Sequence, residues 1–181
     1  MDVYFIRHGQ TNWNLESRIQ GNVDIPLNDT GIRQGKIVAE KLKHIRADLF
    51  FCSPLSRAKQ TANLINEYQH LPIRIDSNIT ERSFGDLEGV TDLSKFSCNL
   101  SILLDTGINF SDYHIEPIKH LLERAMEFIH MLQTDYSNYH TIFVVTHVGV
   151  IQAIDYSLKH CKETSVPLLS VDNAGYLKYQ L

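Results

Sequence analysis

Five residues with chemically active side chains follow short apolar segments of this chain. They are Arg7, His8, Arg57, Glu81 and His147. Each residue alone has an ordinary structural explanation, since the chain has nine histidines and most arginines are surface charges. The joint pattern is different, because positive charge gathered in a concave site needs an anionic ligand. The set therefore predicts an anion-binding site.

Other kinds of site fit these residues less well. His8 and His147 could bind zinc, but a zinc site normally needs three or four ligands. Glu81 is the one obvious third ligand, and the nearby arginines would repel a cation. A Ser/His/Asp triad would need a nucleophile elbow, and the sequence contains no GxSxG. It contains no GxxxxGKS/T or GxGxxG loop for a nucleotide either.

The chemistry that remains is attack by a histidine on phosphorus. Arginines would spread and neutralise the charge on the transferring phosphoryl group. Glu81 would protonate the leaving oxygen and then deprotonate the attacking water.

Strands and helices must alternate along the chain to position these residues. Short β-prone runs are expected at residues 3–6, 48–52, 72–75 and 141–145, with closing strands at 168–171 and 176–179 around a turn at 173–175. Helices are expected at residues 30–45, from Ser53-Pro54 as cap and first helical position to about Tyr68, and at 117–132 and 149–158. On the first helix, Ile32, Ala39 and Leu42 are expected on one side.

This alternation predicts an α/β fold, a single-domain three-layer sandwich with a mostly parallel central sheet and helices on both faces. Ligands of such sheets bind beyond the carboxyl ends of the strands, where the five residues stand. Residues 8–29 are polar and rich in turn residues. Residues 90–115 have no clear period and are expected to form a short lid or loop insertion in a single domain spanning 1–181.

Composition agrees with one globular domain of 181 residues. The formal net charge of −4 and a pI of about 6.1 argue against a nucleic-acid binder driven by bulk charge. No apolar run approaches the roughly 18 residues that a membrane helix needs. Three separated cysteines without a CxxC pattern, and no signal-peptide pattern at the start, favour free thiols in a cytoplasmic protein. No oligomeric state follows from the sequence.

Five blocks of the sequence, taken in order, resemble a known family. They are RHGQTNWN at 7–14 with Arg18, Gln20-Gly21, Asp24, Pro26-Leu27 and Gly31; SPLSRAKQTA at 53–62; Glu81, Gly85 and Glu88-Gly89; Glu116 and Arg124; and THVGV at 146–150. This chain is similar to the histidine phosphatase superfamily, the phosphoglycerate mutase-like family, and within it to the phosphatases. The resemblance covers nearly the whole chain outside residues 90–115.

The resemblance implies a role for each matching position. His8 matches the nucleophile that becomes phosphohistidine, and Glu81 matches the proton donor. The other matching residues bind substrate: Arg7, Arg57 and His147 in the phosphate pocket, Asn14 on the phosphoryl group, and Gln20 and Gly21 in a loop beside the substrate. The family needs no metal or other cofactor. One departure stands in the last block, where Val148 replaces the usual glycine and would crowd a close phosphate.

The sequence thus predicts a metal-independent phosphomonoesterase acting on a small phosphate monoester, with neither nucleic acid nor membrane as partner. The alternatives are a mutase using the same site and a non-catalytic binder of phosphoryl ligands. Residues 90–116 carry four acidic side chains against Lys95, a formal charge of −3. If this segment folds over the site, it would repel a second phosphate, and its apolar side chains could contact an organic moiety. A solvated loop that packs those side chains into the core is an equal expectation.

Overall fold

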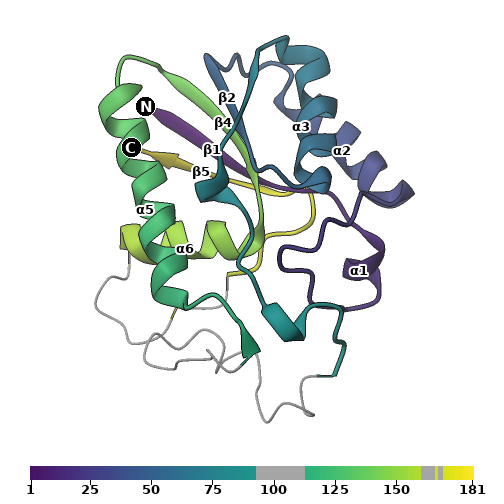
Figure 1. The fold of residues 1–181 in the computed structure, drawn as a ribbon. Coiled ribbons are helices and arrows are strands. Elements are labelled where there is room, and N and C mark those ends of the chain that lie inside the picture. The colour runs from purple at the N-terminus through teal and green to yellow at the C-terminus, as the bar shows by residue number, and fades with distance from the viewer. Residues whose placement is uncertain (93–112, 160–165, 167–168) are drawn as a thin grey trace.

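The computed structural model describes residues 1–92, 113–159, 166 and 169–181. Its described strands form one central sheet in the order β3-β2-β4-β1-β5 (Figure 1). The strands are β1 (Asp2–Arg7), β2 (Leu49–Cys52), β3 (Ile73–Ile75), β4 (Thr141–Thr146) and β5 (Tyr176–Gln180). The pairs β2–β3, β2–β4 and β1–β4 are parallel, and β5 is antiparallel to β1. The predicted mostly parallel sheet is confirmed.

Helices cover both faces of this sheet, which confirms the predicted three-layer sandwich (Figure 1). They are α1 (Asn12–Leu15), α2 (Asp29–Leu42), α3 (Ser56–Gln69), α5 (Ile118–Asp135) and α6 (Val148–Lys159), with 3-10 turns η1 (Ser77–Ile79) and η2 (Gly85–Leu87). None of the described helices is long and apolar enough to cross a membrane.

Side-chain alternation along β1 shows why both faces must be covered. Val3 and Phe5 belong to the buried cluster that includes α5 and α6. Tyr4 and Ile6 belong to the cluster that includes α2 and α3. A strand that is apolar on both sides has no face for water, so its burial between two helical layers is the hydrophobically favoured arrangement.

The register of the central strands aligns the ends of β1, β2 and β4, where the sequence predicted an anion-binding site. Arg7 at the end of β1 pairs with Thr146 at the end of β4, and the amide of His8 donates to the Thr146 carbonyl at 3.0 Å. The amide of Ser53, directly after β2, donates to the Val145 carbonyl at 3.0 Å. Three parallel strands therefore end side by side, and the chain leaves each of them at the same edge of the sheet.

The predicted start of α3 at Ser53-Pro54 is wrong. The helix begins at Ser56, with Leu55 as its N-cap residue and no cap from the Leu55 side chain. Asp24 takes that role from another segment, since its carboxylate accepts from the Ser56 amide at 2.6 Å and from the Ser56 hydroxyl at 2.7 Å. A carboxylate at a helix N-terminus satisfies free amides and complements the dipole. The Ser53 hydroxyl binds elsewhere, as described below.

Other boundaries differ in smaller ways. The turn-rich stretch 8–29 contains α1, which Thr11 caps through a capping box with Asn14. Residues 169–171 of the expected strand 168–171 are not in a strand, while the expected strand at 176–179 is confirmed as β5. Residues 93–112 of the expected lid lie outside the described residues.

The predicted apolar side of α2 is wrong at one position. Ile32 is 37% exposed, whereas Gly31 and Gly35 are buried with Ala39. A Cβ atom on Gly31 would lie 2.0 Å from the carbonyl oxygen of Gln10. The helix therefore packs through Gly31 onto the segment that follows β1, and a larger residue cannot occupy that contact.

Candidate active site

His8 lies at the base of the site, 3% exposed, directly after β1. Its Nδ1 lies 2.7 Å from the carbonyl oxygen of Gly9. Because a carbonyl only accepts, Nδ1 carries the proton and Nε2 keeps its lone pair. Burial holds the pKa of His8 well below its usual range, and the charges of Arg57 and Arg7 lower it further. His8 is therefore a neutral imidazole with Nε2 available for attack.

His147 lies beside His8, directly after β4, with 5.2 Å between the ring centroids. Its Nε2 lies 2.7 Å from the Ser53 hydroxyl, which also accepts from the Leu55 amide at 3.4 Å. Burial lowers the pKa of His147 well below its usual range, and the charges of Arg57 and His8 act in the same direction. With the Ser53 hydroxyl donating to Nε2, the neutral ring carries its own proton on Nδ1, which is then an N–H donor.

Arg57 and Arg7 are held by backbone carbonyls from different segments of the chain. Arg57 is fully buried, and its two terminal nitrogens donate to the carbonyls of Val23 at 2.8 Å and Gly21 at 2.7 Å. Arg7 donates through Nη1 to the carbonyl of Val171 at 2.6 Å. Burial lowers the pKa of both arginines, but guanidinium groups stay charged in proteins. The carbonyls orient both groups without neutralising them.

Three buried polar atoms in the described residues have no hydrogen-bond partner: Arg7 Nε, Arg57 Nε and His147 Nδ1. All three belong to residues that the sequence assigned to the site. A buried donor left unpaired costs about 1–3 kcal/mol, more for a charged group. Three such donors beside the neutral ring of His8 are the arrangement that an oxyanion would complete.

Glu81 lies close to the first turn of α6. Its carboxylate accepts from the Arg82 amide at 2.9 Å and from the Gly149 amide at 3.3 Å. It is 7% exposed. A Cβ atom on Gly149 would lie 2.3 Å from Glu81 Oε1, so the carboxylate occupies the space that a side chain at 149 would need. The backbone of α6 thus fixes one side of this carboxyl group.

Arg124 and Glu116 hold the segment that carries Glu81. Arg124 donates twice to the Glu116 carboxylate, at 2.7 and 2.9 Å, in a pair that is about one tenth exposed. The same guanidinium donates to the carbonyls of Asn78 at 2.7 Å, Thr80 at 2.6 Å and Glu81 at 3.2 Å. Bidentate pairing and three backbone contacts tie this segment to α5. The two residues match the fourth sequence block, but their contact with Glu81 was not predicted.

The remaining predicted substrate-binding residues lie around the same centre. Asn14 Oδ1 accepts from the Thr11 amide at 3.1 Å, which leaves its NH2 group as the end that can donate to a ligand. Gln20 accepts from the Thr11 hydroxyl at 2.8 Å. Gly21 has a φ of +53° and presents its carbonyl to Arg57. Val148 is the first residue of α6.

Two further residues of the site were not identified from the sequence. Ser53 orients His147, and its position directly after β2 was the signal that could have identified it. Asn173 donates to the carbonyl of His8 and to Asn14 Oδ1, both at 3.3 Å. Asn173 stands in a turn far along the chain, and no local pattern relates it to His8.

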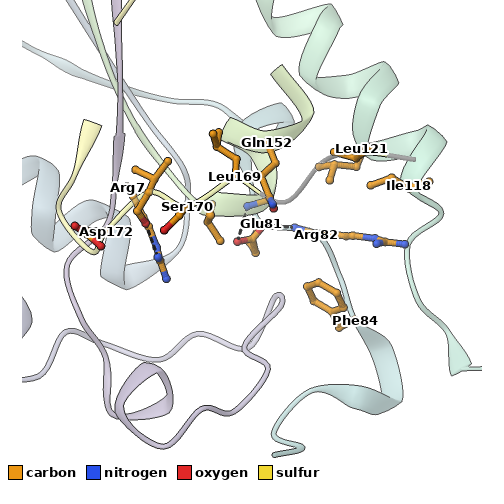
Figure 2. A pocket seen from close by; sticks show the side chains of 14 residues that line it. Arg7, Glu81, Arg82, Phe84, Ile118, Leu121, Gln152, Leu169, Ser170 and Asp172 are labelled. Atoms are coloured by element: carbon orange, nitrogen blue, oxygen red, sulfur yellow. Dashed lines mark hydrogen bonds between the residues drawn. The ribbon is translucent and has the colours of Figure 1, made fainter. Parts of the chain in front are cut away.

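A cavity of about 430 Å³ opens beside the donors, with Arg7 and Glu81 in its wall (Figure 2). Its other lining residues come from α5, α6, the segment after Glu81 and the segment before β5. Within the described ranges, no group of three or more His, Cys, Asp or Glu residues is arranged to hold a metal ion.

The family model, the related sequences and the solved structures that match this chain agree with one another. The model of the histidine phosphatase superfamily (branch 1) matches residues 3–181. The chain is 36% identical to the uncharacterized phosphatase PhoE of Bacillus subtilis, over 84% of this chain and 74% of that protein. It is 29% identical to a metal-independent phosphoserine phosphatase of Arabidopsis thaliana, over 99% of this chain and 77% of that protein. A mycobacterial glucosyl-3-phosphoglycerate phosphatase, solved with VO3, superimposes with a TM-score of 0.89 at 25% identity, covering 98% of this chain and 90% of that one.

Proposed function

The chain belongs to the histidine phosphatase superfamily and is a phosphatase, and we propose that it hydrolyses small phosphate monoesters through a phosphohistidine on His8. The observation that carries this proposal is the group of three unpaired buried donors, from Arg7, Arg57 and His147, around the neutral ring of His8. A phosphoryl group would accept from all three.

In the first step, His8 Nε2 attacks phosphorus and the bond from phosphorus to the ester oxygen breaks. Glu81, in its protonated form, gives its proton to the leaving oxygen, so that a neutral alcohol departs. In the second step, the Glu81 carboxylate takes a proton from water, whose oxygen attacks phosphorus as the bond to His8 breaks. Phosphate leaves, and both residues return to their starting states.

The two arginines and the neutral His147 would donate hydrogen bonds to the transferring phosphoryl group and stabilise its negative charge. The unpaired Nε–H groups of Arg7 and Arg57 would stabilise the equatorial oxygens, and His147 Nδ1–H would add a third donor. Asn14, in α1, would donate to the same group, and Gln20 would lie beside the substrate, with Gly21 holding Arg57 in place. The Val148 amide, at the start of α6, would donate to a phosphoryl oxygen. We propose that no metal or other cofactor takes part.

Removal of the nucleophile tests the mechanism. His8→Ala should lower turnover of an aryl phosphate by several orders of magnitude. Brief mixing with a phosphate-labelled ester followed by alkaline quenching, which preserves phosphohistidine, should give labelled wild-type protein and unlabelled His8→Ala. The matched control is His130→Ala, an exposed histidine of α5, which should keep full activity and labelling. Normal turnover by His8→Ala would overturn the mechanism, and turnover absent from the wild type would favour a non-catalytic binder.

A phosphatase and a mutase are separated by the fate of phosphoglycerates. We expect phosphate release to exceed isomer interconversion, with or without bisphosphoglycerate. Faster interconversion would show that the phosphoryl group returns to a second hydroxyl instead of water. We also propose a cytoplasmic location, in agreement with the buried free thiol of Cys52.

A further inference from the structure

We propose that the organic part of the substrate is apolar and uncharged, and that it binds in the 430 Å³ cavity beside Glu81. This inference rests on the proposed function, because it concerns the leaving group of the same reaction.

The position of Glu81 decides where the leaving group lies. The ester oxygen must come within hydrogen-bond reach of the acid that protonates it. The phosphoryl group must lie beside Arg7. Both residues line the cavity, and Figure 2 shows Arg7 on one side of Glu81 and Phe84 on the other. A substituent on the ester oxygen therefore continues from Glu81 into this space.

The far walls of the cavity are apolar and come from three separate segments. Ile118 and Leu121 come from α5, where both are almost fully buried. Phe84 comes from the segment after Glu81, and Leu169 and Val171 come from the segment before β5. The cavity volume lies within the range of sites that bind small organic ligands. Burial of apolar substrate surface against these side chains would provide binding energy.

The charged residues of the cavity wall are already engaged. Arg82 is 2% exposed, donates through Nε to the carbonyl of Glu116 at 2.8 Å and lies 5.5 Å from the centre of the Phe84 ring. Burial lowers the pKa of Arg82 to about 10, against the opposing charges of Glu116 and Glu81. Asp172 lies in the same wall; burial lowers the pKa of Arg7, and the charges of Glu81 and Asp172 oppose that lowering.

The charge balance disfavours a second anionic group on the substrate. Of the charged residues in the cavity wall, Arg7 is needed for the phosphoryl group, Arg82 already donates to the Glu116 carbonyl, and Asp172 would repel an anion. A substrate carboxylate placed beyond Glu81 would meet apolar walls and lose its hydration without a new partner. Gln152, with its amide in the wall, is compatible with a neutral polar substituent.

The test is a series of monoesters of primary alcohols with similar leaving-group basicity: ethyl, butyl, hexyl and 2-phenylethyl phosphate. Each methylene that leaves water should raise kcat/KM by up to about fourfold. Phosphoserine and 3-phosphoglycerate serve as anionic comparators of similar size. They should be poorer substrates than butyl phosphate, because their carboxylates find no partner in the cavity.

Two wall residues that are only partly buried provide variants expected to fold. Leu169→Ala and Phe84→Ala should each reduce the advantage of hexyl over ethyl phosphate by about threefold to tenfold. Ile37→Ala on the outer side of α2, an exposed apolar residue outside the cavity, is the matched control. It should retain the full advantage of the longer ester.

The outcomes separate this inference from the proposed function. A kcat/KM that rises along the series and rises less in the wall variants supports both. Hydrolysis of the esters with no dependence on chain length, or with the anionic comparators preferred, overturns the apolar substrate class and leaves the phosphatase mechanism standing. A lack of hydrolysis for every ester, aryl phosphates included, overturns the proposed function and this inference with it.

Discussion

The amide of Gly149 donates to Glu81 Oε2, and a Cβ atom at residue 149 would lie 2.3 Å from Glu81 Oε1. The departure from the usual family sequence falls one residue earlier, at Val148, where a side chain lines the cavity instead of meeting the carboxylate. The glycine that α6 requires is therefore Gly149, because the carboxyl group of Glu81 lies against its backbone.

Gly149→Ala should lower kcat for alkyl phosphates by about 10-fold or more, since the displaced Glu81 would lose part of the 10²–10⁴-fold contribution of a general acid. The free energy of unfolding should change little, because a flexible side-chain end can move and alanine favours a helix. The measurement is steady-state kinetics with thermal unfolding of the same samples. In a Glu81→Gln background, Gly149→Ala should have no further effect, and two independent losses would contradict the displacement.

Glu81→Gln should separate esters by their leaving groups. Alkyl phosphates need a proton on the leaving oxygen and should slow by about 10²–10⁴-fold. Aryl phosphates, whose leaving groups are stable as anions, should slow much less. A plot of log kcat against leaving-group pKa measures the difference. Parallel plots for wild type and Glu81→Gln would assign Glu81 a binding role.

Arg124→Met should destabilise the protein by about 3–5 kcal/mol, because it leaves the buried Glu116 carboxylate unpaired. Through the released Glu81 carbonyl, it should also slow alkyl phosphates more than aryl phosphates. Arg124→Lys should recover part of the stability. The control is Arg33→Met, since Arg33 is exposed on α2. Equal slowing of both ester types would show that Arg124 supports the fold without positioning Glu81.

Stability should fall as the pH drops below the ordinary histidine pKa of about 6.5. Burial lowers the folded-state pKa of both His8 and His147, so below pH 6.5 the unfolded chain binds more protons than the folded one. The contribution of the two histidines to the free energy of unfolding is complete above pH 6.5. It is lost on acidification, by up to about 1.4 kcal/mol per pH unit for each histidine. Denaturant unfolding between pH 7 and 5 measures the slope. His8→Ala should make it shallower, whereas an unchanged slope would contradict a neutral buried His8.

Phosphate and orthovanadate should raise the melting temperature, because an oxyanion would pair the three unpaired donors. A ligand at 100 times its Kd stabilises a folded protein by about 2.7 kcal/mol. Arg57→Met should abolish the shift.

Exhaustive EDTA treatment should leave activity intact, and a loss that a divalent ion restores would refute a metal-free mechanism.

Much of the site was predictable because parallel strands end at one edge. Arg7 ends β1, and His8 and His147 directly follow β1 and β4, so strand prediction was sufficient to place them together. Glu81 was harder to place, since it reaches the site through η1 and the contacts of Arg124.

The contacts that were missed depend on distant segments. Ser53 was expected to cap α3, but its hydroxyl binds His147 and Asp24 caps the helix instead. A hydroxyl near a helix N-terminus can cap the helix or bind another side chain, and the local sequence is the same in both cases. The apolar cavity likewise combines three segments that have no common sequence pattern.

The strand order has a consequence for how the protein is made. In the sheet, β1 has only β4 and β5 as neighbours, and both follow residue 140. β1 thus leaves the ribosome before both of its sheet neighbours, and its apolar residues Val3 and Phe5 lack those neighbours until β4 and β5 are made. A chain truncated before β4 would expose β1 as an unpaired apolar edge, prone to aggregation. Because the same pairing brings His8 to His147, synthesis through β4 is a condition for forming the site at all.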